Sequence, residues 1–327
     1  MVNYSSGIIP CGAKRGTYLK LKPQFSEIVD HYIYVMQEEN KLEPASIVIT
    51  ANRGTMFLYY LQNKNHSSLS DITEDEVIDF FVQDGKPFRE TTYRYRVSEF
   101  LRKVSGRYPE CSALDNWLPF IRKTRKNIQF LTKEEVQAIK EVLLSDSNLL
   151  SYSEKAIGLI LLYTGLRGCD IAILKLKNID WEKELISLNQ SKTGVNVTIP
   201  MHVHVGNAIY NYLEHERSTD SEYLFIDSTD HLSPMPVYIL RYHIDKIYTA
   251  AGIRQNKGDR RGTHLFRHHL VTTYLKNDVP QPIITNAVGH YNPASDEPYF
   301  GSNIDHLRKC ALSIEEFPLN WVVFDHA

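Results

Sequence analysis

Apolar residues in the first third of the chain recur at three- and four-residue steps, the spacing of one face of an amphipathic helix. The clearest run consists of Phe25, Ile28, Val29, Tyr32, Ile33 and Met36. Further helices are predicted over 45–61, after the capping box of Thr73 and Glu76, and over 89–108. We therefore expect a small all-α domain, preceded by an irregular arm that contains several glycines.

Helical spacing returns in the second part of the chain but is interrupted once. Thr132 and Glu135 form a capping box, and the apolar run 153–164 predicts a buried central helix. Two short alternating runs, 185–189 and 195–199, flank the turn sequence QSKTG, which is a β-hairpin signal. Further helical runs follow over 205–213, 236–251, 264–277 and after Pro282. This part is therefore expected to be mostly α-helical, with a small antiparallel β-sheet.

These patterns divide the chain into successive parts, and the fold class is mainly α. We expect an arm at 1–20, a helical domain at 21–110, a linker at 111–129 and a second domain at 130–327 with a tail from 300. The tail has an apolar helical stripe formed by Ile304, Leu307, Ala311 and Ile314, and a strongly apolar end. Two interpretations of the tail stay open: it packs on its own domain, or it docks on a neighbouring copy.

Positive and negative charges nearly cancel over the 327 residues, with 37 Lys and Arg against 39 Asp and Glu. Between Lys86 and Lys126, however, eleven basic residues stand against four acidic ones. This segment is either a solvated helix face followed by a charged linker, or a surface that binds phosphates. The total charge therefore does not argue against a nucleic-acid partner.

The sequence contains no motif typical of a membrane protein, a secreted protein, a metal site or a nucleotide-cofactor site. No apolar run approaches the ~20 residues of a membrane helix, the N-terminus has no signal-peptide core, and the four cysteines form no CxxC pair. We therefore expect a cytoplasmic protein without a membrane partner. His202 and His204 would place two imidazoles on one strand face, but no third ligand is visible, so no metal site is predicted. Without a GxxxxGK motif or a carboxylate cluster, no cofactor is expected.

Six residues of the second domain combine reactive side chains with a distinctive order: Arg167, Lys192, His264, Arg267, His290 and Tyr299. Each has an ordinary explanation alone, because cationic side chains commonly stabilise helix ends and a turn lysine is usually solvated. The order is less ordinary. The lysine follows the first arginine by 25 residues, a His-x-x-Arg box shares one helix face, Gly-His follows its arginine by 23, and the tyrosine comes nine residues later.

This order resembles the tyrosine recombinase, or phage integrase, family. The matching strings are TGLRGCDI, SKTG, HLFRHH and VGH, followed by Tyr299 at the family's usual interval. The resemblance is strong over 130–299 and weaker over 21–120. It implies an integrase-like DNA breaking-rejoining fold, in which the first domain is the helical core DNA-binding domain and the second is the catalytic domain.

The resemblance also implies a covalent mechanism. Tyr299 would attack a scissile DNA phosphate to give a 3′-phosphotyrosyl link, so that the strand is rejoined without ATP or metal. Arg167 and Arg267 would hold the negative charge on the nonbridging oxygens, because a guanidinium forms a fixed bidentate fork. Lys192 would protonate the leaving 5′-oxygen.

The remaining residues have supporting roles in this scheme. His264 would take the proton of the tyrosine or orient the phosphate, and His290 would donate to a phosphate oxygen. Asp170, three residues after the first arginine, would brace its guanidinium across one helical turn. The sequence departs from the family pattern where Pro298 directly precedes the tyrosine. Tyr291 also follows His290, but too closely to match the family interval.

Double-stranded DNA with specific recombination sites is the partner that the resemblance implies, with a tetramer of the protein assembled on it and the protein associated with the nucleoid. The residues expected to contact the DNA are Arg89, Arg94, Arg96, Arg102, Lys103, Arg122, Lys123, Arg125, Lys126, Arg260 and Arg261.

Two other functions use a similar fold. A type IB topoisomerase would relax supercoils with a similar catalytic set, whereas a non-catalytic DNA-binding protein would have lost part of it. The helical first domain and the 28 residues after Tyr299 favour a recombinase, and all six positions are filled. Mobile-element integration and chromosome-dimer resolution both stay open as biological roles, and we favour the first.

Overall fold

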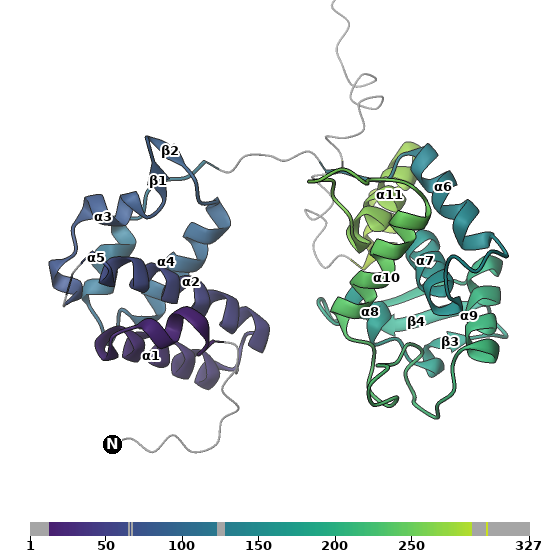
Figure 1. The fold of residues 1–327 in the computed structure, drawn as a ribbon, viewed down its shortest axis with the longest axis horizontal. Helices are drawn as coiled ribbons and strands as arrows, with labels where there is room; N and C mark the ends of the chain where they lie inside the picture. The colour runs from purple at the N-terminus through teal and green to yellow at the C-terminus, as the bar shows by residue number, and fades with distance from the viewer. Residues whose placement is uncertain (1–12, 65, 67, 123–127, 290–298, 300–327) are drawn as a thin grey trace, which may run out of the picture. The chain divides into compact units, whose positions relative to one another are not determined.

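The computed structural model describes residues 13–64, 66, 68–122, 128–289 and 299. The chain forms two compact units, Met1–Arg125 and Lys126–Ala327 (Figure 1). Among the described residues, no helix is both long and apolar enough to cross a membrane.

The first unit is built mainly from helices that surround one apolar core. Its elements are η1 (Gly16–Lys20), α1 (Pro23–Glu39), α2 (Pro44–Gln62), η2 (Leu69–Asp71), α3 (Glu74–Asp79), β1 (Val82–Gln83), β2 (Lys86–Pro87), α4 (Thr91–Val104) and α5 (Glu110–Asn116). The six apolar residues that predicted the first helix are all buried on α1. The capping box at Thr73 is present at the start of α3.

Two local predictions about this unit need correction. Residues from 111 onward were expected to form a linker, but α5 lies there and buries Cys111 and Leu114 in the core of the first unit. Part of the expected arm forms η1, whose Tyr18 packs on the same core and donates a hydrogen bond to Asp30. Both segments were too short to show a helical period, and their contacts with the core decide their structure.

The second unit has more helices and one small sheet. Its elements are α6 (Lys133–Leu144), α7 (Tyr152–Thr164), α8 (Gly168–Ala172), η3 (Leu176–Asn178), β3 (Ile179–Asp180), β4 (Leu185–Asn189), β5 (Asn196–Pro200), α9 (Val203–His215), α10 (Val237–Ala250), α11 (Thr263–Lys276) and α12 (Gln281–Val288).

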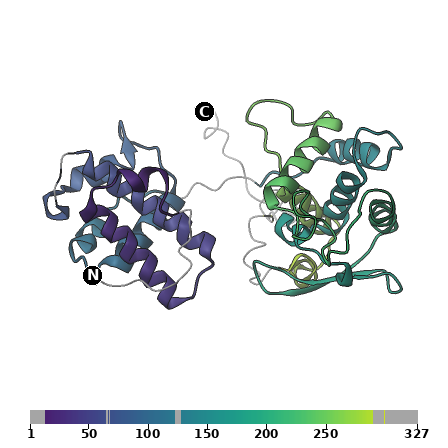
Figure 2. The ribbon, with the colours of Figure 1, turned by 60° about the horizontal axis from the view of Figure 1, so that its bottom comes forward.

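Helix α7 is the centre of the second unit, as its apolar sequence predicted. Ten of its 13 residues are buried, and α6, α9, α10 and α11 pack around it. The strands form an antiparallel sheet in the order β3-β4-β5, with Leu185 opposite Pro200 and Asn189 opposite Asn196. Figure 2 shows this sheet along the lower edge of the unit, with helices above it. The predicted hairpin is therefore confirmed, and its turn lies at the end of β4.

Candidate active site

Arg167 follows a sharp turn at the end of α7. The Thr164 hydroxyl donates to the Ile160 carbonyl at 2.6 Å and accepts from the Leu166 amide at 3.2 Å, while Gly165 has a left-handed φ of 61°. Glycine adopts this conformation without the steric cost of a side chain. The TGLR string therefore ends one helix and places Arg167 immediately before the next.

Arg267 lies on α11 and is buried, with only 3% of its surface exposed. Its Nη1 donates to the Gly165 carbonyl at 3.1 Å, and its Nη2 donates to the Val288 carbonyl at the end of α12. A buried guanidinium needs such acceptors to offset the cost of leaving water. These bonds fix the second arginine of the set against the turn that carries the first.

The turn between β4 and β5 carries Lys192, which is exposed. Asp170, fully buried on α8, anchors the preceding residue: its Oδ1 accepts from the Ser191 amide at 2.8 Å and from the Ser191 hydroxyl at 2.7 Å. The predicted bond between the Asp170 carboxylate and the Arg167 guanidinium is not among the hydrogen bonds of the described residues: apart from a contact of 3.9 Å from the neighbouring Cys169 thiol, this carboxylate bonds to the hairpin. A spacing of three residues would permit a contact between Asp170 and Arg167, but it says nothing about the hairpin, whose position in the fold places Ser191 beside the Asp170 carboxylate.

Gln190 is a site residue that the sequence analysis missed. Its Oε1 accepts from Arg167 Nη1, and its Nε2 donates to the Val288 carbonyl at 3.0 Å, the same oxygen that accepts from Arg267. Glutamine is not one of the residue types whose side chain marks a turn or a functional site, so the sequence contained no signal for this role.

His264 lies near the start of α11, and its pKa is influenced by the basic side chains around it. Its burial among protein atoms, followed by the fields of His268, Arg267, Lys192 and Arg167, lowers its pKa below the ordinary value. Its side chain nevertheless faces solvent. Arg167, Lys192 and Arg267 of the predicted set are therefore close enough to affect the pKa of one accessible imidazole.

Tyr299 is also near this group, through a second residue that sequence reasoning missed. The ring of His268 lies 6.1 Å from that of His264 and 5.4 Å, edge to face, from that of Tyr299. His268 Nδ1 donates to the Gln129 carbonyl at 2.8 Å. Tyr299 itself is 5% exposed and packs in a cluster with Val271, Ile284 and Val288. The paired histidines of HLFRHH were the only signal for His268.

Some predicted residues lie outside the described part of the chain. They are His290, Tyr291, Pro298, Lys123, Arg125, Lys126 and the tail after Tyr299.

Most of the described residues expected to bind DNA have partners within their own unit. Arg89 stacks on Phe80 and donates to its carbonyl, Arg94 donates to the Pro119 carbonyl, and ion pairs join Arg96 to Glu99, Arg102 to Asp115 and Lys103 to Glu39. Arg261 donates to the Arg254 carbonyl, while Arg122 and Arg260 are exposed. Part of the basic segment thus has a structural use.

The two histidines considered as metal ligands also lie differently from expectation. His202 is the N-cap of α9, where its Nδ1 accepts from the His204 amide at 3.2 Å, so the pair is not on a strand face. Their rings are 5.0 Å apart. Within the described ranges, no group of three His, Cys, Asp or Glu side chains could hold a metal ion.

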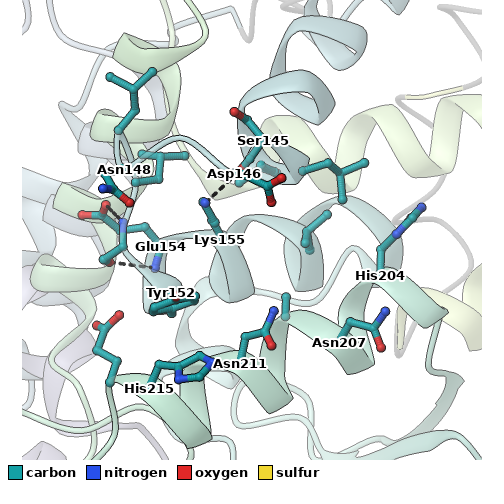
Figure 3. A pocket seen from close by; sticks show the side chains of 18 of the residues that line it. Ser145, Asp146, Asn148, Tyr152, Glu154, Lys155, His204, Asn207, Asn211 and His215 are labelled. Carbon is teal, nitrogen blue, oxygen red and sulfur yellow. Dashed lines mark hydrogen bonds between the residues drawn. The ribbon is translucent and has the colours of Figure 1, made fainter.

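A cavity of about 640 Å³ is lined by residues other than the predicted catalytic ones (Figure 3). It is bordered by the segment between α6 and α7 and by polar side chains of α9, among them Asn207 and Asn211. Lys155 closes one side by donating to the Ser145 carbonyl at 2.7 Å. Arg167, Lys192, His264 and Arg267 are not among its lining residues, so this cavity is not where the predicted catalytic groups converge.

Residues 129–306, more than half of the chain, match the model of the phage integrase family. The chain belongs to this family. Members of the phage integrase family, the tyrosine recombinases, are enzymes that cut and rejoin DNA strands, and this function therefore applies to the present tyrosine recombinase. The family interpretation of the sequence and its mainly α, integrase-like fold are both confirmed.

Relatives of this tyrosine recombinase cover different shares of the chain. It is 31% identical over 192 residues to the putative integrase/recombinase y4gC of Sinorhizobium fredii, covering 56% of the chain and 94% of that protein. It is 29% identical over 300 residues to the tyrosine recombinase XerA of Pyrococcus furiosus, covering 90% of each.

Solved structures show the same fold at lower identity. The XerH recombinase bound to its difH substrate has a TM-score of 0.62 and 17% identity, with 91% of this chain and 86% of that chain covered. The Tn1549 transposon integrase in complex with transposon right end DNA has a TM-score of 0.61 and 13% identity, with 87% of this chain and 99% of that chain covered.

Proposed function

We propose that this tyrosine recombinase cleaves and rejoins DNA at specific sites with Arg167, Lys192, His264, Arg267, His290 and Tyr299 as its catalytic residues. The observation that carries this assignment is geometric: Arg167 bonds to Gln190, Gln190 and Arg267 bond to the same Val288 carbonyl, and the Tyr299 ring lies beside His268, the neighbour of His264. A cluster of cations at an accessible surface suits a reaction in which negative charge grows on a phosphate.

In the proposed reaction, the Tyr299 oxygen forms a bond to the scissile phosphorus while the bond to the 5′-oxygen breaks. The tyrosine proton passes to His264, and Lys192 supplies a proton to the leaving oxygen. The lowered pKa of His264 supports this role, because it favours the neutral imidazole that can accept a proton. The phosphotyrosyl ester keeps the energy of the broken bond, so the reverse attack rejoins a strand.

Arg167 and Arg267 would stabilise the transition state through its nonbridging oxygens. The bonds from Arg267 to two backbone carbonyls support a fixed placement of that guanidinium before substrate binds. A preorganised donor avoids the cost of reorienting at the moment of reaction. His290 would add a further donor to the phosphate.

We further propose that the partner is duplex DNA carrying specific recombination sites, on which four copies assemble. The first unit would be the core DNA-binding domain and the second the catalytic domain, while the apolar tail end would dock on a neighbouring copy. The DNA complexes of the XerH recombinase and the Tn1549 integrase support a DNA partner. Of the biological roles, we favour integration of a mobile element and action at the nucleoid.

The test is covalent capture on DNA. A duplex is selected from a random-sequence pool by binding to the protein, and versions nicked at successive positions are incubated with it. The version that gives an SDS-resistant adduct is called the capture duplex. We expect Tyr299→Phe to bind the capture duplex normally and to form no adduct, because only the nucleophilic oxygen is removed.

Tyr291→Phe is the matched control and should form the adduct at the wild-type rate. An adduct with Tyr299→Phe but none with Tyr291→Phe would assign the nucleophile to the wrong tyrosine. Relaxation of a supercoiled plasmid without the selected sequence, at the rate seen with it, would instead favour a topoisomerase.

A further inference from the structure

Gln190 occupies an unusual position for a polar side chain in a turn. It directly follows β4 and is only 1% exposed, whereas Asn189 before it and Ser191 after it are exposed. Burying an amide costs free energy unless its polar atoms find partners. The hairpin therefore points this one side chain into the protein, where its contacts must offset that cost.

Both the oxygen and the nitrogen of the Gln190 amide form hydrogen bonds. These bonds connect Gln190 directly to Arg167 and, through a shared carbonyl, to Arg267. Oε1 accepts from Arg167 Nη1 and from the Thr193 hydroxyl at 3.1 Å, while Nε2 donates to the Val288 carbonyl at 3.0 Å. Arg267 donates to the same carbonyl. Within the described part of the chain, the bond to Gln190 is the one hydrogen bond that the Arg167 side chain makes.

Gly289 closes the other side of the amide. A Cβ atom at this position would lie 2.5 Å from the amide carbon of Gln190, and the glycine has a left-handed φ of 63°. The Thr193 hydroxyl also reaches the Gly289 carbonyl, at 3.4 Å. The glycine of the VGH string therefore leaves room for Gln190, and the amide is confined between the hairpin and the end of α12.

We propose that Gln190 is a positioning residue that sets the orientation of the Arg167 guanidinium toward the scissile phosphate. The inference rests on the proposed function, since it needs Arg167 to contact the nonbridging oxygens. Gln190 touches no reacting atom itself. Through the shared Val288 carbonyl, it keeps the Arg167 guanidinium at a fixed position relative to that of Arg267, so that both guanidiniums can contact the same phosphate.

The expected size of the effect follows from the geometry. Without Gln190, the Arg167 guanidinium would keep its charge but lose the acceptor that orients it. A misplacement of about 1 Å at a reacting centre can cost about 10²-fold in rate. We therefore expect Gln190→Met, which keeps the length of the side chain but removes both polar ends, to slow cleavage of the capture duplex about 10- to 100-fold.

The experiment compares adduct formation on three forms of the capture duplex. One has the ordinary phosphodiester; one has a methylphosphonate, in which a neutral methyl replaces a charged nonbridging oxygen; one has a 5′-bridging phosphorothiolate, whose leaving group needs no proton. Asn189→Ala is the matched control, because it removes the neighbouring, exposed amide. Gln190→Asn, which keeps an amide on a shorter side chain, is a second variant with an expected intermediate loss.

If Gln190 orients Arg167, the loss in Gln190→Met is large on the phosphodiester and the phosphorothiolate but less than about threefold on the methylphosphonate, where less charge must be held. An equal loss on all three duplexes would overturn the proposal in favour of a general structural role. A loss that disappears only on the phosphorothiolate would also overturn it and would link Gln190 to Lys192 instead.

The same outcomes in Gln190→Asn decide the question if Gln190→Met does not fold. Failure of the underlying function is recognised separately, because the wild-type protein would then form no Tyr299-dependent adduct on any of the three duplexes.

Discussion

Replacing Glu154 by glutamine should destabilise the second unit, and the loss should depend on pH. Glu154 lies in the first turn of α7 and is 2% exposed. Its carboxylate accepts from His243 Nδ1 at 3.0 Å, from Lys246 Nζ at 2.8 Å and from the Ser151 amide at 2.9 Å. It therefore joins the start of the central helix to α10. Gln has the same shape but no charge.

The magnitude follows from the pKa of this carboxyl. Burial alone would raise the pKa of Glu154, but the bonds from His243, Lys246 and the Ser151 amide outweigh burial and lower it to about 2. An unfolded glutamate has a pKa of about 4.3. The gap corresponds to about 3 kcal/mol of stability at pH 7.

The sign of the pH dependence is fixed by this lowered pKa. The contribution is complete above the unfolded pKa and is lost as the pH falls toward the folded one, with about half left at pH 3. We therefore expect Glu154→Gln to reduce the free energy of unfolding by about 3 kcal/mol at pH 7 and by about half as much at pH 3.

Urea unfolding at the two pH values, read by a short deuterium pulse in peptides of α7 and α10, measures the second unit by itself. Glu222→Gln is the control, because that carboxylate pairs with Lys175 at an exposed site and should leave the midpoint unchanged. A wild-type stability for Glu154→Gln at pH 7, or an equal loss at both pH values, would refute the reasoning.

Three further outcomes are expected. Lys192→Ala should regain near-normal cleavage on the 5′-phosphorothiolate duplex and Arg167→Ala should not, since only the first loses a proton donor; equal rescue of both would remove Lys192 from that role. Gly54→Ala should lower the unfolding free energy by about 1–3 kcal/mol, because its Cβ would lie 2.4 Å from the Phe100 ring; an unchanged thermal midpoint would contradict this. Deleting residues 318–327 should leave a folded monomer that binds one site but forms little four-protomer synapse on a native gel. Assembly at the wild-type level would exclude docking of the tail on a neighbouring copy, and an insoluble product would indicate that the tail packs on its own domain.

The sequence alone was sufficient to predict those elements whose formation depends on neighbouring residues. The apolar spacing from Phe25 predicted α1 and its buried face, and the capping boxes at Thr73 and Thr132 marked the starts of α3 and α6. The turn signal QSKTG placed the hairpin between β4 and β5. Helix periodicity, caps and turns depend on residues within a few positions of one another, so a linear pattern contains them. The order of the catalytic residues likewise identified the family.

Only the tertiary structure decided which side chains meet. Gln190 bonds to a carbonyl 98 residues away, and the Asp170 carboxylate bonds to Ser191 rather than to the Arg167 guanidinium. Arg102, which was expected to contact DNA, forms an ion pair with Asp115, and α5 is a helix where a linker was expected. These contacts depend on how helices and the hairpin pack, which sets distances between residues far apart in the chain. No spacing along the sequence determines such distances, because one local pattern is compatible with many neighbours until the core selects one.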